Sequence, residues 1–376
     1  MDRSRGYTSS HQKTTVYQIM HGDTLAAVLD GRGRCRICEP QLLPYSLYLE
    51  EAAEDFDLCL QNLSNFYFWC ASRVLTLDRV YAKEILNSIG ASQGTTDRER
   101  ARIALSYHCL SLADIFWVRE EGETVTFSEL NLYENSLSNA FVDVALKGRQ
   151  MTIENRDLIA DDLSVSGMFP KAWVRDVDGI WLLKDGEEDA VAREILASRI
   201  CSCFACHQVR YERAEYEGTP VSRCRLLTSL EYGIVTREAF DIYAANQEIQ
   251  PLDYIFQLDG YGYDMMNVLD YLVGNTDRHW GNWGLLIRNA DNRPVRLHDL
   301  MDFNRAFSAY DSLEGAGCLT TEKPGQMSQQ EAAVLAVKRS GLNQTAEIRE
   351  EWFVGREKDY EMFQRRYAIL KQFCQK

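Results

Sequence analysis

The sequence of 376 residues is poor in proline and contains no long apolar run. With only 7 prolines and 23 glycines it offers no long Pro- or Gly-rich linker, and its length alone suggests about two or three domains. No stretch approaches the roughly 18 consecutive apolar residues of a transmembrane helix. Residues 1–15 are polar and basic, and no apolar segment follows them as in a signal peptide. We therefore expect a cytoplasmic protein that does not engage membranes.

Basic residues are also too few to dominate the surface. The chain has 41 Lys and Arg against 56 Asp and Glu, which leaves a formal net charge of −15. Duplex nucleic acids are bound through clustered Lys and Arg that neutralise phosphates, so we expect no direct nucleic-acid binding. The proportions of hydrophobic (45%) and charged (26%) residues are those of a folded globular protein, which excludes wholesale disorder.

The 11 cysteines include two CxxC pairs, Cys35 with Cys38 and Cys203 with Cys206. Together the pairs could supply four zinc ligands, but they lie far apart in the chain. The second pair, followed by His207, also matches the CxxCH pattern of haem attachment, which we treat as a coincidence because no export signal is visible. In a reducing compartment free thiols are the favoured interpretation.

The order of periodic segments predicts an α+β fold. Strand–turn–strand patterns span Val16 to about Gly31 around His21-Gly22-Asp23, Lys171 to Lys184 around Asp178-Gly179, and Gly284 to Leu297 with a turn at Asn289 to Arg293. Helical patterns are present over residues 128–146, which look mostly helical, and from about Ala190 to Phe204, and they dominate after Ala239. The pattern indicates a bilobal protein with a β-rich N-lobe at 153–236 and a helical C-lobe at 237–376. An additional N-terminal α/β region occupies 1–152, and its first dozen residues are expected to be disordered.

The segment NTDRHWGN (275–282), followed by DLMDFN (299–304), carries the most chemical information. A phosphotransferase needs a carboxylate to orient the attacking hydroxyl, an oxygen ligand for Mg²⁺ a few residues later, and a further carboxylate for the same metal. Asp277, Asn282 and Asp302 supply these groups, and protein kinases use the same Asp-to-Asn spacing in their HRDxxxxN loop. We predict all three as catalytic residues, with Asn282 and Asp302 as the metal ligands.

Residues upstream match the rest of such a site. Lys184 ends a predicted strand and Glu194 lies on the following helix, as in the Lys–Glu pair that kinases place over the nucleotide phosphates. A turn of small residues could cover the phosphates with its backbone N–H groups. We assign nucleotide binding to Lys184, Glu194, Ser164, Ser166, Gly167 and His279, the last as a side chain that buttresses the catalytic loop.

Two carboxylates compete for the metal position after the predicted strand pair. Asp302 is flanked by Leu300, Met301 and Phe303, whereas Asp299 follows a polar run. A carboxylate in apolar surroundings is costly unless a cation compensates it. We therefore predict Asp302 as the ligand and Asp299 as a surface or supporting acid.

The motifs GNTDRHWGNWGLLI and LHDLMDFNRAF resemble those of the HipA-like serine/threonine kinases, distant relatives of the phosphoinositide kinases, whose loop is also DRHxxN. The resemblance covers roughly residues 160–376, while LSLADIFWV and LNLYENSLSNAF are similar to HipA-like proteins of Firmicutes and their phages. It implies a protein-kinase-like fold, the use of ATP and Mg²⁺, and self-phosphorylation at Ser164 or Ser166. The sequence departs from many kinases in having DFN in place of DFG.

The function that these features favour is ATP- and Mg²⁺-dependent transfer of the γ-phosphate to a hydroxyl of a protein substrate. The resemblance adds an antitoxin-like or regulatory protein as a partner. One alternative is a pseudokinase that binds a nucleotide or a partner without turnover, and the intact set of Lys184, Asp277, Asn282 and Asp302 argues against it. The other is a kinase or nucleotidyl transferase that acts on a non-protein acceptor.

Overall fold

A computed structural model describes residues 14–73, 96–135, 158–159, 171–185, 188–216 and 218–374. The described residues form a mixed α+β arrangement with three antiparallel sheets. Among the described residues, no helix is long and apolar enough to cross a membrane. The predicted nucleotide-binding turn with Ser164, Ser166 and Gly167 lies outside the described residues.

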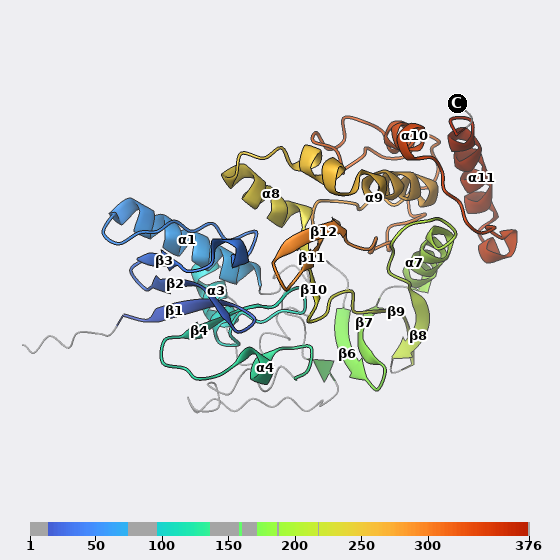
Figure 1. Ribbon diagram of the computed structural model, residues 1–376. Coiled ribbons are helices and arrows are strands. Elements are labelled where there is room, and N and C mark those ends of the chain that lie inside the picture. The colour runs from blue at the N-terminus through green and yellow to red at the C-terminus, as the bar shows by residue number, and fades with distance from the viewer. Residues whose placement is uncertain are drawn as a thin grey trace, which may run out of the picture.

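The N-terminal part is built on a four-stranded sheet with the order β3-β2-β1-β4 (Figure 1). The sequence predicted its first hairpin, because a turn at Gly22 separates two alternating apolar segments. Two helices pack together beside it, and a short helix and a 3₁₀ turn complete this part. Its elements are β1 (Val16–His21), β2 (Thr24–Asp30), β3 (Cys35–Ile37), η1 (Pro40–Leu42), α1 (Phe56–Ser72), α3 (Asp97–Leu105), β4 (Phe116–Glu120) and α4 (Phe127–Leu130).

Residues 128–146 look mostly helical in sequence, but the described residues among them form only the end of a short helix. Only α4 is helical, its first turn closed by a capping box between Thr126 and Glu129. After Leu130 the chain turns, and the Asn131 side chain accepts from the backbone N–H of Glu134 at 3.0 Å. Asparagine competes in this way with helical backbone bonds, which explains the early end. Residues 136–146 lie outside the described part.

The second sheet has five strands in the order β5-β6-β7-β9-β8. The predicted hairpin around Asp178-Gly179 is present as β6 and β7, with Gly179 at a positive φ of 133°. The sequence did not indicate β8, an edge strand whose charged side chains give no apolar alternation. The elements are β5 (Leu158–Ile159), β6 (Lys171–Asp176), β7 (Gly179–Asp185), α7 (Glu188–Cys201), β8 (Glu212–Tyr216) and β9 (Thr219–Arg225).

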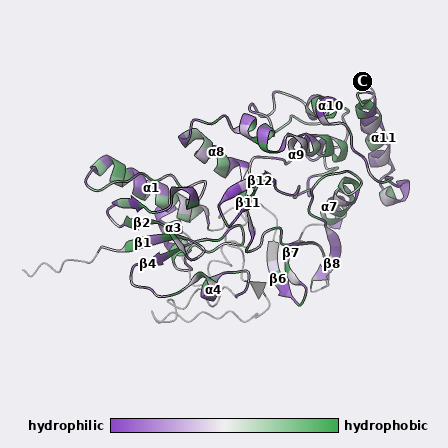
Figure 2. Cartoon of the chain, in the orientation of Figure 1, coloured by the Kyte–Doolittle hydropathy of each residue, from purple (hydrophilic) through white to green (hydrophobic). Residues whose placement is uncertain are grey.

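Helices dominate the C-terminal part, as the sequence predicted (Figure 1). A three-stranded sheet of order β10-β11-β12 accompanies them. Helix α11 presents both hydrophobic and hydrophilic residues, as a helix with one buried side should (Figure 2). The elements are β10 (Tyr232–Thr236), α8 (Arg237–Asn246), α9 (Pro251–Val273), β11 (Gly284–Arg288), β12 (Arg293–Leu297), α10 (Gln329–Ser340), η2 (Glu350–Phe353) and α11 (Glu357–Lys371).

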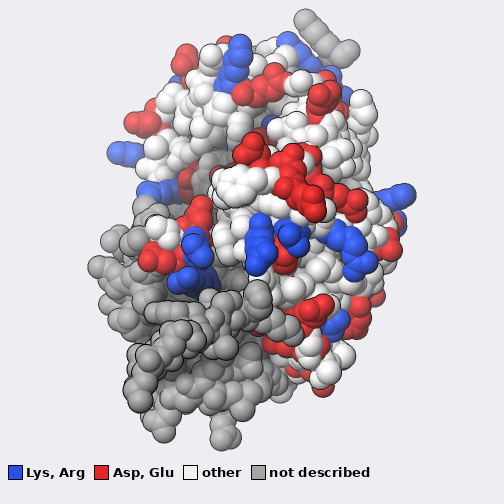
Figure 3. All heavy atoms as spheres, turned by 90° about the vertical axis from the view of Figure 1, so that its left-hand side faces the viewer, with Lys and Arg blue, Asp and Glu red and all other residues white. Residues whose placement is uncertain are grey.

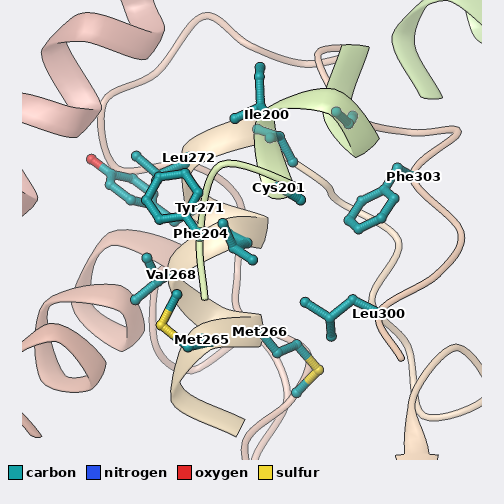
Figure 4. Packing of buried hydrophobic residues seen from close by; sticks show 14 of the residues in the cluster. Ile200, Cys201, Phe204, Met265, Met266, Val268, Tyr271, Leu272, Leu300 and Phe303 are labelled. Carbon is teal, nitrogen blue, oxygen red and sulfur yellow. The ribbon is translucent and has the colours of Figure 1, made fainter. Parts of the chain in front are cut away.

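Two hydrophobic clusters are formed by the residues that the structure describes. One lies between the N-terminal sheet and its helices, and it also takes in Trp173 of β6 and Ile180 of β7. The other joins α7, α9, α10 and α11 with the segment that carries the DFN motif. Figure 4 shows Phe303 of that motif in this cluster with Cys201 of α7 and Met266 of α9. The DFN segment is therefore anchored in the larger core.

Charge is mixed on the face that Figure 3 shows, where acidic and basic side chains lie next to one another over the described part. The net charge of −15 is therefore not expressed there as one continuous acidic field.

Candidate active site

A buried lysine lies at the centre of the candidate site. The Nζ atom of Lys184 on β7 lies 2.6 Å from Oε1 of Glu194 on α7 and 3.0 Å from Oδ1 of Asp302. The ion pair expected between Lys184 and Glu194 is thus present. The third group, Asp302, is 118 residues away from Lys184 in the chain. The cluster therefore links the five-stranded sheet to the DFN segment.

The surroundings keep Lys184 charged. Burial is the largest influence and favours the neutral amine, but Asp302 and Glu194 together outweigh it and raise the pKa of Lys184 well above its usual range. Glu194 is itself fixed, because Ser222 of β9 donates to its Oε2 atom at 2.5 Å. The ammonium is therefore held between two carboxylates, one of which is itself fixed by a hydrogen bond.

Tyr211 is a further member of this cluster that the sequence did not reveal. Its hydroxyl oxygen accepts from Lys184 Nζ at 3.2 Å and from the backbone N–H of Asp302 at 3.1 Å. Asp302 adopts a positive φ of 61°, a left-handed conformation that non-glycine residues seldom take. The Tyr211 contact supports this backbone, which directs the carboxylate of Asp302 toward Lys184. A single tyrosine before a strand has no sequence signature that would predict this role.

The loop with the second half of the motif begins where α9 ends. Gly274 caps the helix with a φ of 62°, and a Cβ atom there would lie 2.3 Å from the ring of Tyr310. The position therefore requires glycine for its conformation and for space. Asn275 follows, and its side chain donates to Asp270 on α9 at 3.0 Å. The loop is thus anchored from its first residue.

Arg278 is the main internal support of the loop. Its guanidinium donates to both carboxylate oxygens of Asp270, at 2.8 and 3.0 Å, and these two side chains are only 3% and 6% exposed. It also donates to the backbone oxygens of Asn282 at 3.0 Å and of Met301 at 2.5 Å. One side chain therefore holds the end of the loop, the helix before it and the residue preceding Asp302.

Asp277 and Asn282 lie within this supported loop. The Nδ2 atom of Asn282 donates to the backbone oxygen of Asp277 at 2.7 Å, so the five-residue spacing closes a turn. Asp277 is half-buried. Burial raises the pKa of its carboxyl group, and the negative charge of Asp302 adds to the rise against an opposing contribution from His279. Asp277 and Asp302 are therefore near enough to interact electrostatically.

His279 has an exposed ring that shapes the loop locally. Its Nδ1 atom accepts from the backbone N–H of Gly281 at 3.0 Å. This contact stabilises the turn between Asp277 and Asn282, the buttressing expected from the sequence. Asp299, the competitor for the metal position, forms an ion pair with Arg296 at 2.8 Å, whereas Asp302 pairs with Lys184.

The cysteines are free thiols in the structure. Cys203 and Cys206 follow the end of α7 at Cys201 rather than lying within a helix, contrary to the sequence interpretation. Within the part of the chain that the structure describes, no three His, Cys, Asp or Glu side chains are gathered as a metal site.

Comparison with known proteins rests on structure, because no family model matches the chain and no curated protein sequence matches it. The chain superposes on HipA with a TM-score of 0.50 at 11% identity, and 95% of each chain is covered. This HipA comes from a complex of HipA, HipB and operator DNA of the Shewanella oneidensis MR-1 toxin–antitoxin system. CtkA, a proinflammatory kinase of Helicobacter pylori, gives a TM-score of 0.43 at 14% identity over 56% of this chain and 91% of its own. The resemblance to HipA suggested by the motifs is confirmed at the level of the fold, which is a mixed α+β fold similar to that of HipA.

Proposed function

We propose that the protein is an ATP- and Mg²⁺-dependent kinase that transfers the γ-phosphate to a serine or threonine hydroxyl of a protein. The observation that carries the proposal is the buried contact of Lys184 with both Glu194 and Asp302, next to a loop that Arg278 anchors through Asn282 and Met301. These elements come from three separate parts of the sequence. Their convergence supports phosphotransfer more strongly than any one motif does.

Lys184 is the proposed phosphate contact. Its charge is maintained by two carboxylates, Glu194 and Asp302. Glu194 would keep Lys184 in place beside the phosphates, and Asp302 would be the carboxylate available to Mg²⁺. This division explains why a kinase needs an acid on the helix as well as one after the strand pair.

Asp302 and Asn282 fit the requirements of Mg²⁺. The ion prefers carboxylate and amide oxygens, and in nucleotide sites it takes only one or two carboxylates together with phosphates and waters. Asp302 already faces a cation, since Lys184 Nζ lies 3.0 Å from its Oδ1 atom. When bound, Mg²⁺ would neutralise charge on the transferred phosphoryl group. Asn282 and Asp302 would hold it.

Asp277 is the proposed residue that orients the acceptor hydroxyl and accepts its proton. Its raised pKa makes the carboxylate a better proton acceptor than an exposed aspartate. Because Arg278 and Asn282 fix the loop backbone, the position of Asp277 relative to Asp302 is set before substrates bind. Such preorganisation is the main contribution of the protein to phosphoryl transfer.

The proposal includes the two-lobed organisation expected from the sequence, with an N-lobe at 153–236, a C-lobe at 237–376 and the region 1–152 preceding them. We also propose that the protein acts in the cytoplasm, where ATP is available, and that an antitoxin-like or regulatory protein binds it. The complex of HipA with HipB from Shewanella oneidensis supports a partner of this kind. Self-phosphorylation at Ser164 or Ser166 remains part of the proposal.

Mass spectrometry of the purified protein, incubated with ATP and Mg²⁺ alone and with cell lysate, tests the function. We expect covalent phosphate on a serine or threonine, on the protein or on a lysate protein, and with Asp277→Asn we expect none beyond that of the lysate alone. Asp291→Asn, at an exposed ion pair, is the matched control and should behave as the parent. Transfer of AMP would support the nucleotidyl transferase alternative. Nucleotide binding with no transfer to any acceptor would support a pseudokinase.

A further inference from the structure

A small cavity lies directly beside the catalytic loop. It has a volume of about 350 Å³ and is formed by α8, the loop itself and the segment that follows the DFN motif. Its lining consists of Glu238, His279, Trp280, Gly281, Leu319 and Pro324. This volume is at the low end of pockets that hold small ligands, so the cavity suits one side chain rather than a protein surface.

The walls of the cavity are fixed to one another. The backbone N–H of Glu238 donates to the oxygen of Trp280 at 3.1 Å, and the Trp280 indole donates to the oxygen of Leu319 at 3.0 Å. The carboxylate of Glu238 reaches the loop, since its Oε2 atom lies 4.0 Å from where a Cβ atom on Gly281 would be. Three separate elements therefore form one preformed wall.

Glu238 places an acidic group at this cavity without a cation to balance it. Its side chain is exposed, and among the described residues no ion pair or side-chain hydrogen bond engages its carboxylate. The adjacent Arg237 is directed elsewhere: it bonds to Asp241 at 2.5 Å and lies over the rings of Trp280 and Trp283. The carboxylate is thus available to a cation from outside the chain.

The cavity is also close to the site of transfer. His279, on its wall, is two residues after Asp277, and each residue of a chain spans at most about 3.6 Å. A side chain that fills the cavity therefore belongs to a residue within about three positions of the hydroxyl that Asp277 orients. Trp280, Leu319 and Pro324 offer an apolar surface to the methylene stem of a long cationic side chain.

We propose that this cavity binds an arginine or lysine side chain of the protein acceptor, one to three residues from the phosphorylated serine or threonine. The proposal rests on the proposed function, because it requires a protein acceptor at Asp277. Glu238 recognises the charge of the incoming side chain, and the apolar wall recognises its stem. A charge-assisted contact at a preformed carboxylate favours basic peptides over neutral ones.

A library of peptides with one fixed serine or threonine tests the proposal. Each position from three before to three after the acceptor is varied in turn, and phosphorylation is followed with radiolabelled ATP. We expect the parent to prefer Arg or Lys over Ala at one position by about tenfold in kcat/KM, a difference of about 1.4 kcal/mol. Glu238→Gln should reduce this ratio, and Glu238→Arg should shift the preference at that position toward Asp or Glu.

The matched control is Glu231→Gln at an exposed glutamate just before β10, whereas Glu238 follows the other end of that strand, and this variant should keep the parent's ratio. Phosphorylation of peptides without any basic preference overturns the cavity proposal alone. So does a basic preference that Glu238→Arg leaves unchanged. A parent that phosphorylates no peptide overturns the cavity proposal together with the protein acceptor of the proposed function.

Discussion

Removal of the Arg278 side chain should both destabilise the protein and disable the loop. Arg278 and Asp270 are buried together, so Arg278→Met leaves a buried carboxylate whose remaining side-chain partner is Asn275. Breaking a buried ion pair from one side costs about 3–5 kcal/mol of folding free energy. Arg278→Lys keeps the charge but cannot reach the carboxylate and both backbone oxygens at once. At about 1 kcal/mol per lost hydrogen bond, it should cost about 1–3 kcal/mol.

Denaturant unfolding of the parent and the variants measures these losses, and a cycle with Asp270→Asn isolates the coupling between the two side chains. The control is Arg288→Met, which breaks an exposed pair with Asp291 and should cost less than about 1 kcal/mol. In the same variants, kcat/KM should fall by about 100-fold, because the loop that positions Asp277 loses its anchor. If Arg278→Met is no less stable than Arg288→Met, the buried network does not support the loop and the reasoning is refuted.

Three further results are expected. Glu194→Gln should weaken ATP binding in a titration by about tenfold or more, since Lys184 loses one of its two carboxylates; unchanged affinity would remove Glu194 from the site. Asp302→Ala should abolish Mg²⁺-dependent ATP binding measured by calorimetry, whereas Asp299→Ala should retain most of it, and the reverse result would exchange their roles. The acid limb of kcat/KM against pH should lie above the ordinary aspartate value of about 3.9, because burial raises the pKa of Asp277 and only the ionised form accepts a proton. A limb at the ordinary value would contradict that assignment.

The raised pKa of Asp277 also affects the folding free energy, and the direction of that effect can be stated. A carboxyl group whose folded pKa lies above its unfolded value stabilises the fold fully only below the unfolded pKa, and this contribution is lost as the pH rises through the folded pKa. At neutral pH the ionised Asp277 therefore opposes folding slightly. A stability cost of this kind is expected for the proposed catalytic carboxylate, because functional residues are often held at the expense of stability.

Local patterns were sufficient for much of the fold. The hairpins β1–β2, β6–β7 and β11–β12 were predicted because alternating apolar residues and turn residues lie close together in the sequence. Strand β8 was missed because an edge strand needs no apolar face, and the helix expected after residue 128 stops at Leu130. The first error arises because the partner strand β9 decides the structure of β8, and the second because the Asn131 side chain competes locally with helical backbone bonds.

The features of the candidate site also fall into two groups, those that the sequence predicts and those that only the folded structure shows. The spacing of Asp277 and Asn282 and the positions of Lys184 on a strand and Glu194 on a helix are properties of the sequence, since each depends on a few neighbouring residues. Only the tertiary structure decided that Lys184 also contacts Asp302 and that Tyr211 supports that contact. The choice of partner for a buried charge depends on which distant groups are removed from water with it, and this is determined only when the chain has folded.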